Sequence, residues 1–434
     1  MTIFCTHFLY FRHSLAISAR ICYTFPRKQI FPEEFSMKEL YPCASPAVVG
    51  LSAGLTEAID QMTKTDLADG LVSCAAIQVI CKDKTVYKGN HGFADADGKV
   101  PLEDRHLFRM ASMTKPVTAV CVMKQIEAGK LSLEDPVGKY LPALQNMEVA
   151  ETDADGNLTG THPAAPITVK DLLTHSSGLG SGPWFGKFCR DAGFAEGSTL
   201  GSKIDDWGHS LLEFDPGTRF SYSGLVGFDV LAHLVELTSG MAYADFAKEK
   251  LFLPLGMTDT CFLPNEDQWS RIVQMHETVE KGVIRPVDMH GHVFGSCPVT
   301  YHSGGAGLVS CLNDYTRFAH MLLCDGISGD VRILQDSTVQ QMRTMQLRPL
   351  VPDTDATYSW GLSMRVILAD NGSQRPLRTG AYGWSGAYGT HFWCDPVRQL
   401  CAVYCSNMTT AGGSGALTAR HLEKAVMDNL GDLA

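Results

Sequence analysis

Hydrophobic residues recur with different periods along this chain, and these periods predict its secondary structure. Over residues 45–62 they return every three or four positions, which predicts a helix. Two apolar runs follow at Val72–Cys81 and Thr85–Phe93, and the polar turn Lys82-Asp83-Lys84 between them is typical of a two-stranded hairpin. The helical period resumes over Val117–Gly129, so a second helix is expected there.

The middle of the chain carries helix and loop patterns. A helix is predicted over Leu225–Leu237, where apolar residues share one face, and it is expected to stop at Gly240. Polar, glycine-bearing stretches at Asp153–Thr161 and Gly178–Pro183 are predicted to be loops.

A period of two returns in the C-terminal part. Apolar residues alternate over Tyr358–Leu368, which predicts a half-buried antiparallel strand. Two further strands are predicted at Gly383–Trp393 and Gln399–Ser406, with a turn at Asp395-Pro396. A helix over Leu417–Val426 is expected to close the chain.

The strands near both ends and the helices between them predict an α/β (α+β) fold. We expect one α/β domain, formed by residues 45–130 and 331–434, with an antiparallel five-stranded sheet flanked by helices. Residues 131–330 are expected to form an inserted, mostly helical domain.

Residues 1–44 are predicted to be a poorly ordered N-terminal extension. Arg12, His13 and Arg20 interrupt every apolar run in this segment, so it lacks the core of a secretory signal and the length of a membrane span. Two alternatives are an atypical export or membrane-association segment and a translation start at Met37.

Composition narrows the class of protein. Of the 434 residues, 45% are hydrophobic and 19% charged, so a large core can form. The net charge of −11, without clustered Lys and Arg, argues against nucleic acid as a partner. The 14 cysteines are scattered and form no C-x-x-C pair, which argues against a structural zinc site and favours the reducing cytoplasm.

A serine and a lysine three residues apart are the first candidates for chemistry. Ser112 and Lys115 lie at a predicted helix start, so their side chains share one face. A serine hydroxyl needs a base to become a good nucleophile, and a helix N-terminus offers N–H groups to an oxyanion. Taken alone, the pattern fits a serine at the helix N-terminus beside an exposed lysine equally well.

Two later segments could complete such a site. Tyr222-Ser223-Gly224 precedes the predicted helix at residue 225, and a tyrosine placed there could shuttle a proton. In Gly383-Trp384-Ser385-Gly386-Ala387, glycine permits close backbone approach, so the N–H of Ala387 could be a second oxyanion donor beside that of Ser112. The alternatives are a packed tyrosine and an ordinary edge-strand glycine.

In this order and spacing, the three elements resemble the serine β-lactamase and penicillin-binding-protein superfamily, which uses S-x-x-K. Further segments are similar to that family from about Ala47 to Met427: Phe108–Lys115, Lys130–Val137, Leu172–Leu179, Pro216–Ser223, Pro254–Met257 and Gly304–Leu308. The resemblance implies Ser112, Lys115 and Tyr222 as catalytic residues. It implies substrate binding by Ser223, Trp384, Ser385 and Gly386.

Two departures from the family pattern bear on the substrate. Gly224 stands where many members have an Asn that reaches the substrate amide, and Trp384 stands where they have a Lys that binds the substrate carboxylate. Trp384 offers an apolar wall instead. These features resemble the family VIII carboxylesterases and the related fungal acyltransferase that esterifies a polyketide alcohol.

Other segments match known catalytic or metal-binding motifs only in part. Gly383–Ala387 nearly reads G-x-S-x-G but ends in alanine, so the nucleophile-elbow signature fails. His276–Glu280 lacks the second histidine of a zinc protease, and His290-Gly291-His292 is interpreted as a polar loop. His175 is expected to order a loop through hydrogen bonds. No metal and no cofactor are predicted.

The sequence therefore predicts a cytoplasmic serine hydrolase that cleaves carboxylic esters through an acyl-enzyme on Ser112. Its expected partner is a small-molecule ester or amide, with no nucleic acid and no stable membrane insertion; no oligomeric state is predicted. The alternatives are a β-lactamase or D-amino-acid peptidase, an acyltransferase of the same fold, and a slowly turning-over penicillin-binding sensor.

Overall fold

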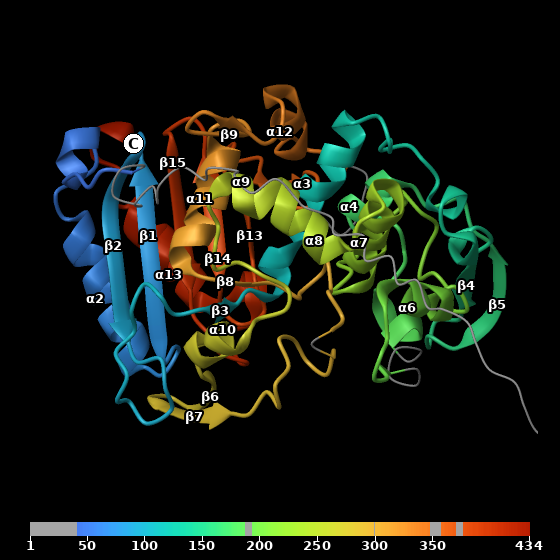
Figure 1. Ribbon diagram of the computed structural model, residues 1–434, viewed down its shortest axis with the longest axis horizontal. Helices are drawn as coiled ribbons and strands as arrows, with labels where there is room; N and C mark the ends of the chain where they lie inside the picture. Colours follow the sequence, from blue (N-terminus) through green and yellow to red (C-terminus); the bar gives the residue numbers. More distant parts are fainter. Residues whose placement is uncertain (1–40, 187–192, 299, 348–356, 370–375) are drawn as a thin grey trace, which may run out of the picture. The chain divides into compact units, whose positions relative to one another are not determined.

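A computed structural model describes residues 41–186, 193–298, 300–347, 357–369 and 376–434. Its main element is a seven-stranded sheet in which all neighbouring strands are antiparallel (Figure 1). In sheet order the strands are β11 (Tyr358–Trp360), β12 (Arg365–Ile367), β13 (Tyr382–Ser385), β14 (His391–Asp395), β15 (Leu400–Cys405), β1 (Cys74–Cys81) and β2 (Lys84–Gly92).

The predicted antiparallel sheet flanked by helices is confirmed, but its count of five strands was wrong. Two of the predicted strands fold back on themselves. The run over 358–368 is broken at Ser363, whose φ of 77° turns the chain between β11 and β12. The run over 383–393 turns between Ser385 and His391, which pair across β13 and β14. Apolar residues continue through the first turn, so a period of two did not reveal it, whereas the second turn contains Gly386 and Gly389, which sequence periodicity does not register.

The central strands join the two ends of the described chain. β15, near the C-terminus, pairs with β1, near the N-terminal side, in a register that places Ala76 opposite Cys405. Alternate residues of β1 enter two different apolar cores: Ala76 and Ile80 pack on one face, and Ile77 and Val79 on the other. Both faces of the sheet are therefore covered.

Helices from both ends of the chain cover one face. These are α2 (Leu55–Ala68) and α13 (Leu417–Met427), which contact each other and share an apolar core with β1 and β15. On the other face, α11 (Leu312–Leu323) crosses β14, β15 and β1 (Figure 1), and α3 (Thr114–Glu127) packs against α7 (Val226–Ser239). The short 3-10 turn Ala111–Met113, directly before α3, contacts β13.

The helix predictions were right in three places and partly wrong in one. α3, α7 and α13 occupy the predicted ranges, and α7 ends at Gly240, whose φ is 72°. The helix expected over residues 45–62 is instead a short 3-10 turn, Pro46–Val49, and then α2, because the chain turns at Gly50 with φ 92°.

The middle region contains strands as well as helices. β4 (Glu148–Thr152) and β5 (Leu158–Pro163) form a hairpin where a loop was predicted for Asp153–Thr161. Most of their residues are exposed, so their apolar pattern is weak.

The other strands are β3 (Phe108–Arg109), β6 (Met275–Glu280), β7 (Val283–Val287), β8 (Val309–Ser310), β9 (Ile327–Ser328) and β10 (Val331–Arg332). The remaining α-helices given for the described chain are α4 (Val169–Leu173), α6 (Leu200–Trp207), α8 (Tyr243–Ala247), α9 (Leu253–Leu255), α10 (Glu266–Arg271) and α12 (Asp336–Met342).

Residues 1–40 of the predicted N-terminal extension lie outside the described residues. In the part of the chain that is described, no helix has both the length and the apolar character needed to cross a membrane. The division into domains at residues 130 and 330 stays a prediction.

Candidate active site

Ser112 lies in a single 3-10 turn, Ala111–Met113, directly before α3. Ala111 has a φ of 47°, a left-handed conformation that is uncommon for a residue with a side chain. Thr114 stabilises the turn, because its Oγ1 donates to the Ala111 carbonyl at 2.6 Å. From the sheet, Asn407 Oδ1 accepts from the Arg109 N–H at 3.2 Å, and Asn407 Nδ2 donates to the Arg109 carbonyl at 3.3 Å. The turn that carries Ser112 is therefore held on both sides.

Lys115 is completely buried, and its amine points at Ser112. The distance from Lys115 Nζ to Ser112 Oγ is 3.2 Å. Nζ also donates to the carbonyls of Gly224, at 2.7 Å, and Gly305, at 3.0 Å. In the neutral amine, two N–H groups satisfy these carbonyls, and the lone pair is left for the Ser112 hydroxyl.

A buried aspartate holds the carbonyl of Gly305 in place. Asp229 Oδ1 accepts hydrogen bonds from the Gly305 N–H at 3.0 Å and from Ser303 Oγ at 2.7 Å, and its Oδ2 accepts from the hydroxyl of Tyr301 at 2.9 Å. Burial raises the pKa of the Asp229 carboxyl from 3.8 to about 6. A Cβ on Gly305 would lie 2.8 Å from the Leu225 carbonyl oxygen, so glycine permits this close approach to the start of α7.

Tyr222 places its ring over the lysine and its hydroxyl beside a tryptophan. Lys115 Nζ lies 4.9 Å from the centre of the Tyr222 ring. The indole Nε1 of Trp384 donates to the Tyr222 hydroxyl at 3.1 Å. Trp384 thus binds the hydroxyl of Tyr222 directly, but neither Trp384 nor Gly386 is among the residues that line the cavity beside Ser112, so their predicted contact with substrate stays a prediction.

His175 forms hydrogen bonds with the backbone on both sides of Tyr222. Its carbonyl accepts from the Ser221 N–H at 3.0 Å, and its Nδ1 accepts from the Ser223 N–H at 3.1 Å. Because Nδ1 accepts, the ring proton is on Nε2. Burial, followed by the nearby Lys115, holds the pKa of His175 well below its usual value, so the ring is neutral. The predicted ordering of a loop by His175 agrees with these contacts.

Gly386 lets the end of β13 approach the serine turn. A Cβ on Gly386 would overlap the carbonyl oxygen of Met110 and Thr390 Oγ1. Thr390 Oγ1 donates to the same Met110 carbonyl at 2.9 Å. This contact places Ala387 next to the turn that carries Ser112.

Ser223 and Ser385, both predicted to bind substrate, are buried. Ser223 Oγ accepts from the Gly227 N–H at 3.0 Å, in the first turn of α7. Ser385 Oγ lies 2.8 Å from His391 Nδ1. Neither is among the residues that line the cavity beside Ser112. Their assignment to substrate binding stays a prediction.

A cavity of about 460 Å³ adjoins these groups. Ser112, Tyr222, Gly224 and Ala387 all line it, so the structure brings the predicted nucleophile, tyrosine and second N–H donor to one space. Most of its other lining side chains are apolar: Phe185, Phe194, Trp207, Leu225, Val226 and Phe294. Such a cavity suits a small ligand with an apolar group.

The sheet order and the serine–lysine pair at a helix start define a serine hydrolase fold of the penicillin-binding type. The chain belongs to the beta-lactamase family, whose model matches residues 59–427. Sequence reasoning had anticipated this family. It had missed Asp229 and Asn407, which act through backbone groups of distant segments.

Several relatives share most of the chain. It is 35% identical over 362 residues to an uncharacterized protein of Mycobacterium tuberculosis, covering 77% of this chain and 86% of that protein. It is 26% identical over 392 residues to esterase EstB of Burkholderia gladioli, covering 85% and 93% respectively. A putative D-alanyl-D-alanine carboxypeptidase of Escherichia coli is 27% identical over 392 residues, covering 84% of this chain and 85% of that protein.

Solved structures share the fold. EstCE1, described as a hydrolase with promiscuous acyltransferase activity, has a TM-score of 0.72 at 23% identity and covers 86% of this chain and 98% of its own. Unliganded simvastatin synthase (LovD) of Aspergillus terreus, as its selenomethionyl derivative, has a TM-score of 0.71 at 22% identity, covering 89% and 98%.

Proposed function

We propose that this protein is a serine carboxylesterase that forms an acyl-enzyme on Ser112. The observation that carries the proposal is the distance of 3.2 Å between Lys115 Nζ and Ser112 Oγ at the wall of an apolar cavity. The similarity to an esterase over 85% of the chain supports the choice of reaction.

The proton path follows from the hydrogen bonds of Lys115. The Ser112 hydroxyl gives its proton to the amine as Oγ attacks the ester carbonyl. The resulting ammonium has three N–H donors, and three acceptors surround it: Oγ and the carbonyls of Gly224 and Gly305. Both protonation states of the lysine are therefore accommodated without movement.

The remaining groups act on the two oxygen atoms of the ester. The N–H groups of Ser112 and Ala387 bind the carbonyl oxygen as it becomes an oxyanion. Tyr222 donates a proton to the leaving alcohol as the bond between that alcohol and the acyl carbon breaks, and Tyr222 recovers its proton from the Lys115 ammonium. Water then attacks the acyl-enzyme and releases the acid, which restores the Ser112 hydroxyl.

An ester is favoured over a β-lactam by what surrounds the cavity. Trp384 replaces the lysine that binds a substrate carboxylate in many family members, and its Nε1 is already bonded to Tyr222. Gly224 uses its carbonyl for Lys115 and has no side chain to bind a substrate amide. The one lysine given in the lining, Lys203, has its Nζ paired with Asp206, and the mostly apolar lining suits an uncharged acyl or alcohol group.

The test is hydrolysis of a short p-nitrophenyl ester by Ser112→Ala, compared with Ser270→Ala on the exposed side of α10. We expect the first variant to lose activity by at least about a thousandfold and the second to keep it. A fluorophosphonate probe should label the wild-type protein on Ser112. Wild-type activity in Ser112→Ala would overturn the proposal.

The same preparation separates the alternatives. Nitrocefin turnover that rivals ester turnover would favour a β-lactamase or peptidase. Ester products formed with an added alcohol in place of water would favour an acyltransferase. An acyl adduct that persists for hours in the intact mass would favour a penicillin-binding sensor.

A further inference from the structure

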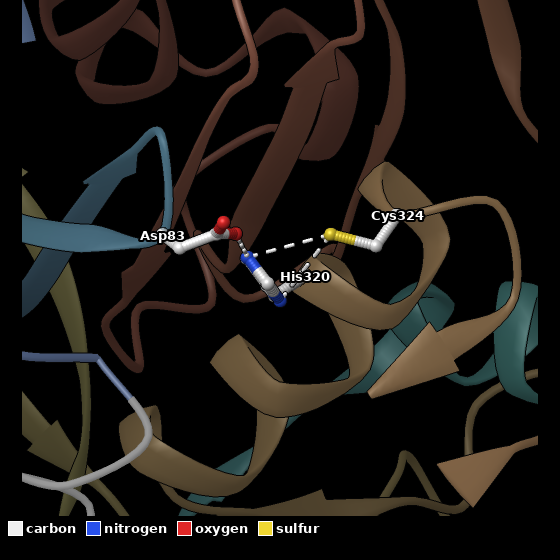
Figure 2. Close-up of side chains that lie close together, drawn as sticks. All are labelled: Asp83, His320 and Cys324. Atoms are coloured by element: carbon white, nitrogen blue, oxygen red, sulfur yellow. Dashed lines mark hydrogen bonds and ion pairs between the residues drawn. The ribbon is translucent and has the colours of Figure 1, made fainter. Parts of the chain in front are cut away.

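Three potential metal ligands meet outside the proposed active site. Asp83 lies in the turn between β1 and β2, and His320 and Cys324 lie one turn apart at the end of α11. Figure 2 shows the three side chains pointing toward one another. None of them lines the cavity beside Ser112.

One atom of each side chain converges on the same small space. His320 Nε2 lies 2.9 Å from Asp83 Oδ1 and 3.5 Å from Cys324 Sγ, and all the ligand atoms lie within 4.8 Å of one another (Figure 2). In a tetrahedral zinc site, the ligand distances imply separations of roughly 3.3 Å between O and N and roughly 3.6 Å between N and S. The two distances from His320 Nε2 differ from these values by a few tenths of an ångström, and the third separation, between Asp83 and Cys324, lies within 4.8 Å.

The cluster is held by rigid elements. His320 and Cys324 are four residues apart on a helix, a spacing that aligns side chains on one face. The His320 side chain is 8% exposed, and its ring packs 4.6 Å from that of Tyr41. Lys82 and Asp83 both have positive φ, of 49° and 60°, so they form a tight two-residue turn that fixes the direction of the Asp83 side chain.

The arrangement differs from that of a cysteine nucleophile with a histidine base. In such a site the thiol and the carboxylate bind opposite nitrogens of the imidazole ring. Here Cys324 Sγ is nearly equidistant from the two ring nitrogens, at 3.5 Å from Nε2 and 3.7 Å from Nδ1, while Nε2 contacts Asp83. A metal ion bound by Nε2 and Asp83 would therefore require the Cys324 side chain to rotate toward Nε2.

We propose that Asp83, His320 and Cys324 bind one divalent transition-metal ion, with Zn²⁺ the best match. A thiolate, an imidazole and a carboxylate are the ligand set that borderline-soft Zn²⁺ prefers. The Asp83 side chain is 74% exposed, which leaves an entry path and a fourth position for water. On binding, the Cys324 thiol releases its proton to solvent and forms a sulfur–metal bond, without oxidation or reduction.

The ion would join parts of the chain that are far apart in sequence. It would tie the β1–β2 turn to the end of α11, more than two hundred residues later. A ligand that binds the folded protein and not the unfolded chain stabilises the fold. No metal was predicted from the sequence, because it contains no C-x-x-C pair and because Asp83 lies 237 residues before His320.

The test uses Co²⁺ as a probe on metal-free full-length protein. We expect one equivalent to bind, with thiolate-to-cobalt charge-transfer absorption and the visible bands of a tetrahedral site, both abolished by added Zn²⁺. Cys324→Ser should lose the charge-transfer band, and Asp83→Asn should weaken binding at least tenfold. Cys261→Ser, which changes another partly exposed cysteine, should match the wild type.

Thermal melting gives a second readout. Zn²⁺ should raise the Tm of the wild type and of Cys261→Ser but not that of Cys324→Ser. Circular dichroism of the metal-free variants shows whether each one is folded before it is compared. The proposal is overturned if the wild type binds no stoichiometric Co²⁺, or if Cys324→Ser binds with an unchanged spectrum.

Discussion

The ring of His175 packs against that of Tyr222, with the ring centres 4.4 Å apart, while its backbone and side chain bind the residues on either side of Tyr222. His175 itself has a φ of 59°, and in this conformation both its carbonyl and its imidazole face the backbone segment from Ser221 to Ser223. The histidine touches no reacting atom, so we regard it as a positioning residue for Tyr222.

Replacing His175 should therefore lower kcat more than it changes KM. His175→Ala removes the ring and the acceptor for the Ser223 N–H, and misplacement of a catalytic group costs on the order of a hundredfold in rate. His175→Asn should lose less, because its amide oxygen can accept that hydrogen bond and asparagine tolerates a positive φ. Steady-state kinetics and Tm measured together distinguish this role from a purely structural one. Equal losses in both variants, matched by equal losses of Tm, would contradict it.

Trp384→Phe should reduce kcat by up to about tenfold. The change keeps an aromatic ring beside Tyr222 but removes the Nε1 donor, and a neutral hydrogen bond contributes about 0.5–1.5 kcal/mol. Trp360→Phe is a matched control, because the Trp360 indole nitrogen is buried and has no hydrogen-bond partner among the described residues. Similar kcat values for the two variants would argue against a role for the Trp384 N–H.

Gly386→Ala should lower kcat by about a hundredfold or more. Its new Cβ would overlap the Met110 carbonyl oxygen and push the Ala387 N–H away from Ser112, and loss of one oxyanion donor costs about 10²–10³ in rate. In Gly415→Ala, by contrast, the new Cβ meets nothing within 4 Å. That variant should keep full ester hydrolysis, and circular dichroism should report both proteins as folded.

Asp229 should make folding stability depend on pH in acid. The pKa of its carboxyl rises from 3.8 in the unfolded chain to about 6 in the fold, so between these values the folded protein holds a proton that the unfolded chain releases. The free energy of unfolding contributed by this group is therefore largest below pH 3.8 and falls by about 3 kcal/mol as the pH rises to 6. Asp229→Asn cannot titrate and should lack this decline.

Urea unfolding of the wild type and of Asp229→Asn at pH 4, 5, 6 and 7 measures the difference. The stability of the wild type relative to the variant should fall as the pH rises and level off above pH 6. Asp428→Asn, which changes an exposed carboxylate paired with Lys424, should show no such trend relative to the wild type. A constant difference between the wild type and Asp229→Asn would contradict the prediction.

The candidate site residues predicted from the sequence are those that depend on local patterns, and their catalytic roles stay predictions. Ser112 and Lys115 share a helix start, Tyr222 precedes a strongly periodic helix, and Gly386 marks a close backbone approach. Each signal lies within a few residues of the group it concerns. The antiparallel sheet and the helices around it followed from hydrophobic periodicity in the same way.

The features that were missed depend on contacts across the chain. Asn407 binds the backbone of Arg109 from 298 residues away, and Asp229 binds Gly305 from 76 residues away, so no local pattern marks either one. The turn at Ser363 was hidden because apolar residues continue on both sides of it. Hydrophobic periodicity predicts which residues are buried, but it does not predict where a buried segment turns back on itself.

The pairing of β1 with β15 also bears on how the protein is made. Ala76 and Cys405 are more than three hundred residues apart, so during synthesis on the ribosome β1 can pair with β2 at once, but its second neighbour, β15, exists only after more than three hundred further residues. Until then its apolar edge is open to pairing with other chains. Asn407, which binds the backbone just before Ser112, is synthesised 298 residues after Arg109. The turn that carries Ser112 can take its final shape only after that long stretch of chain has been made.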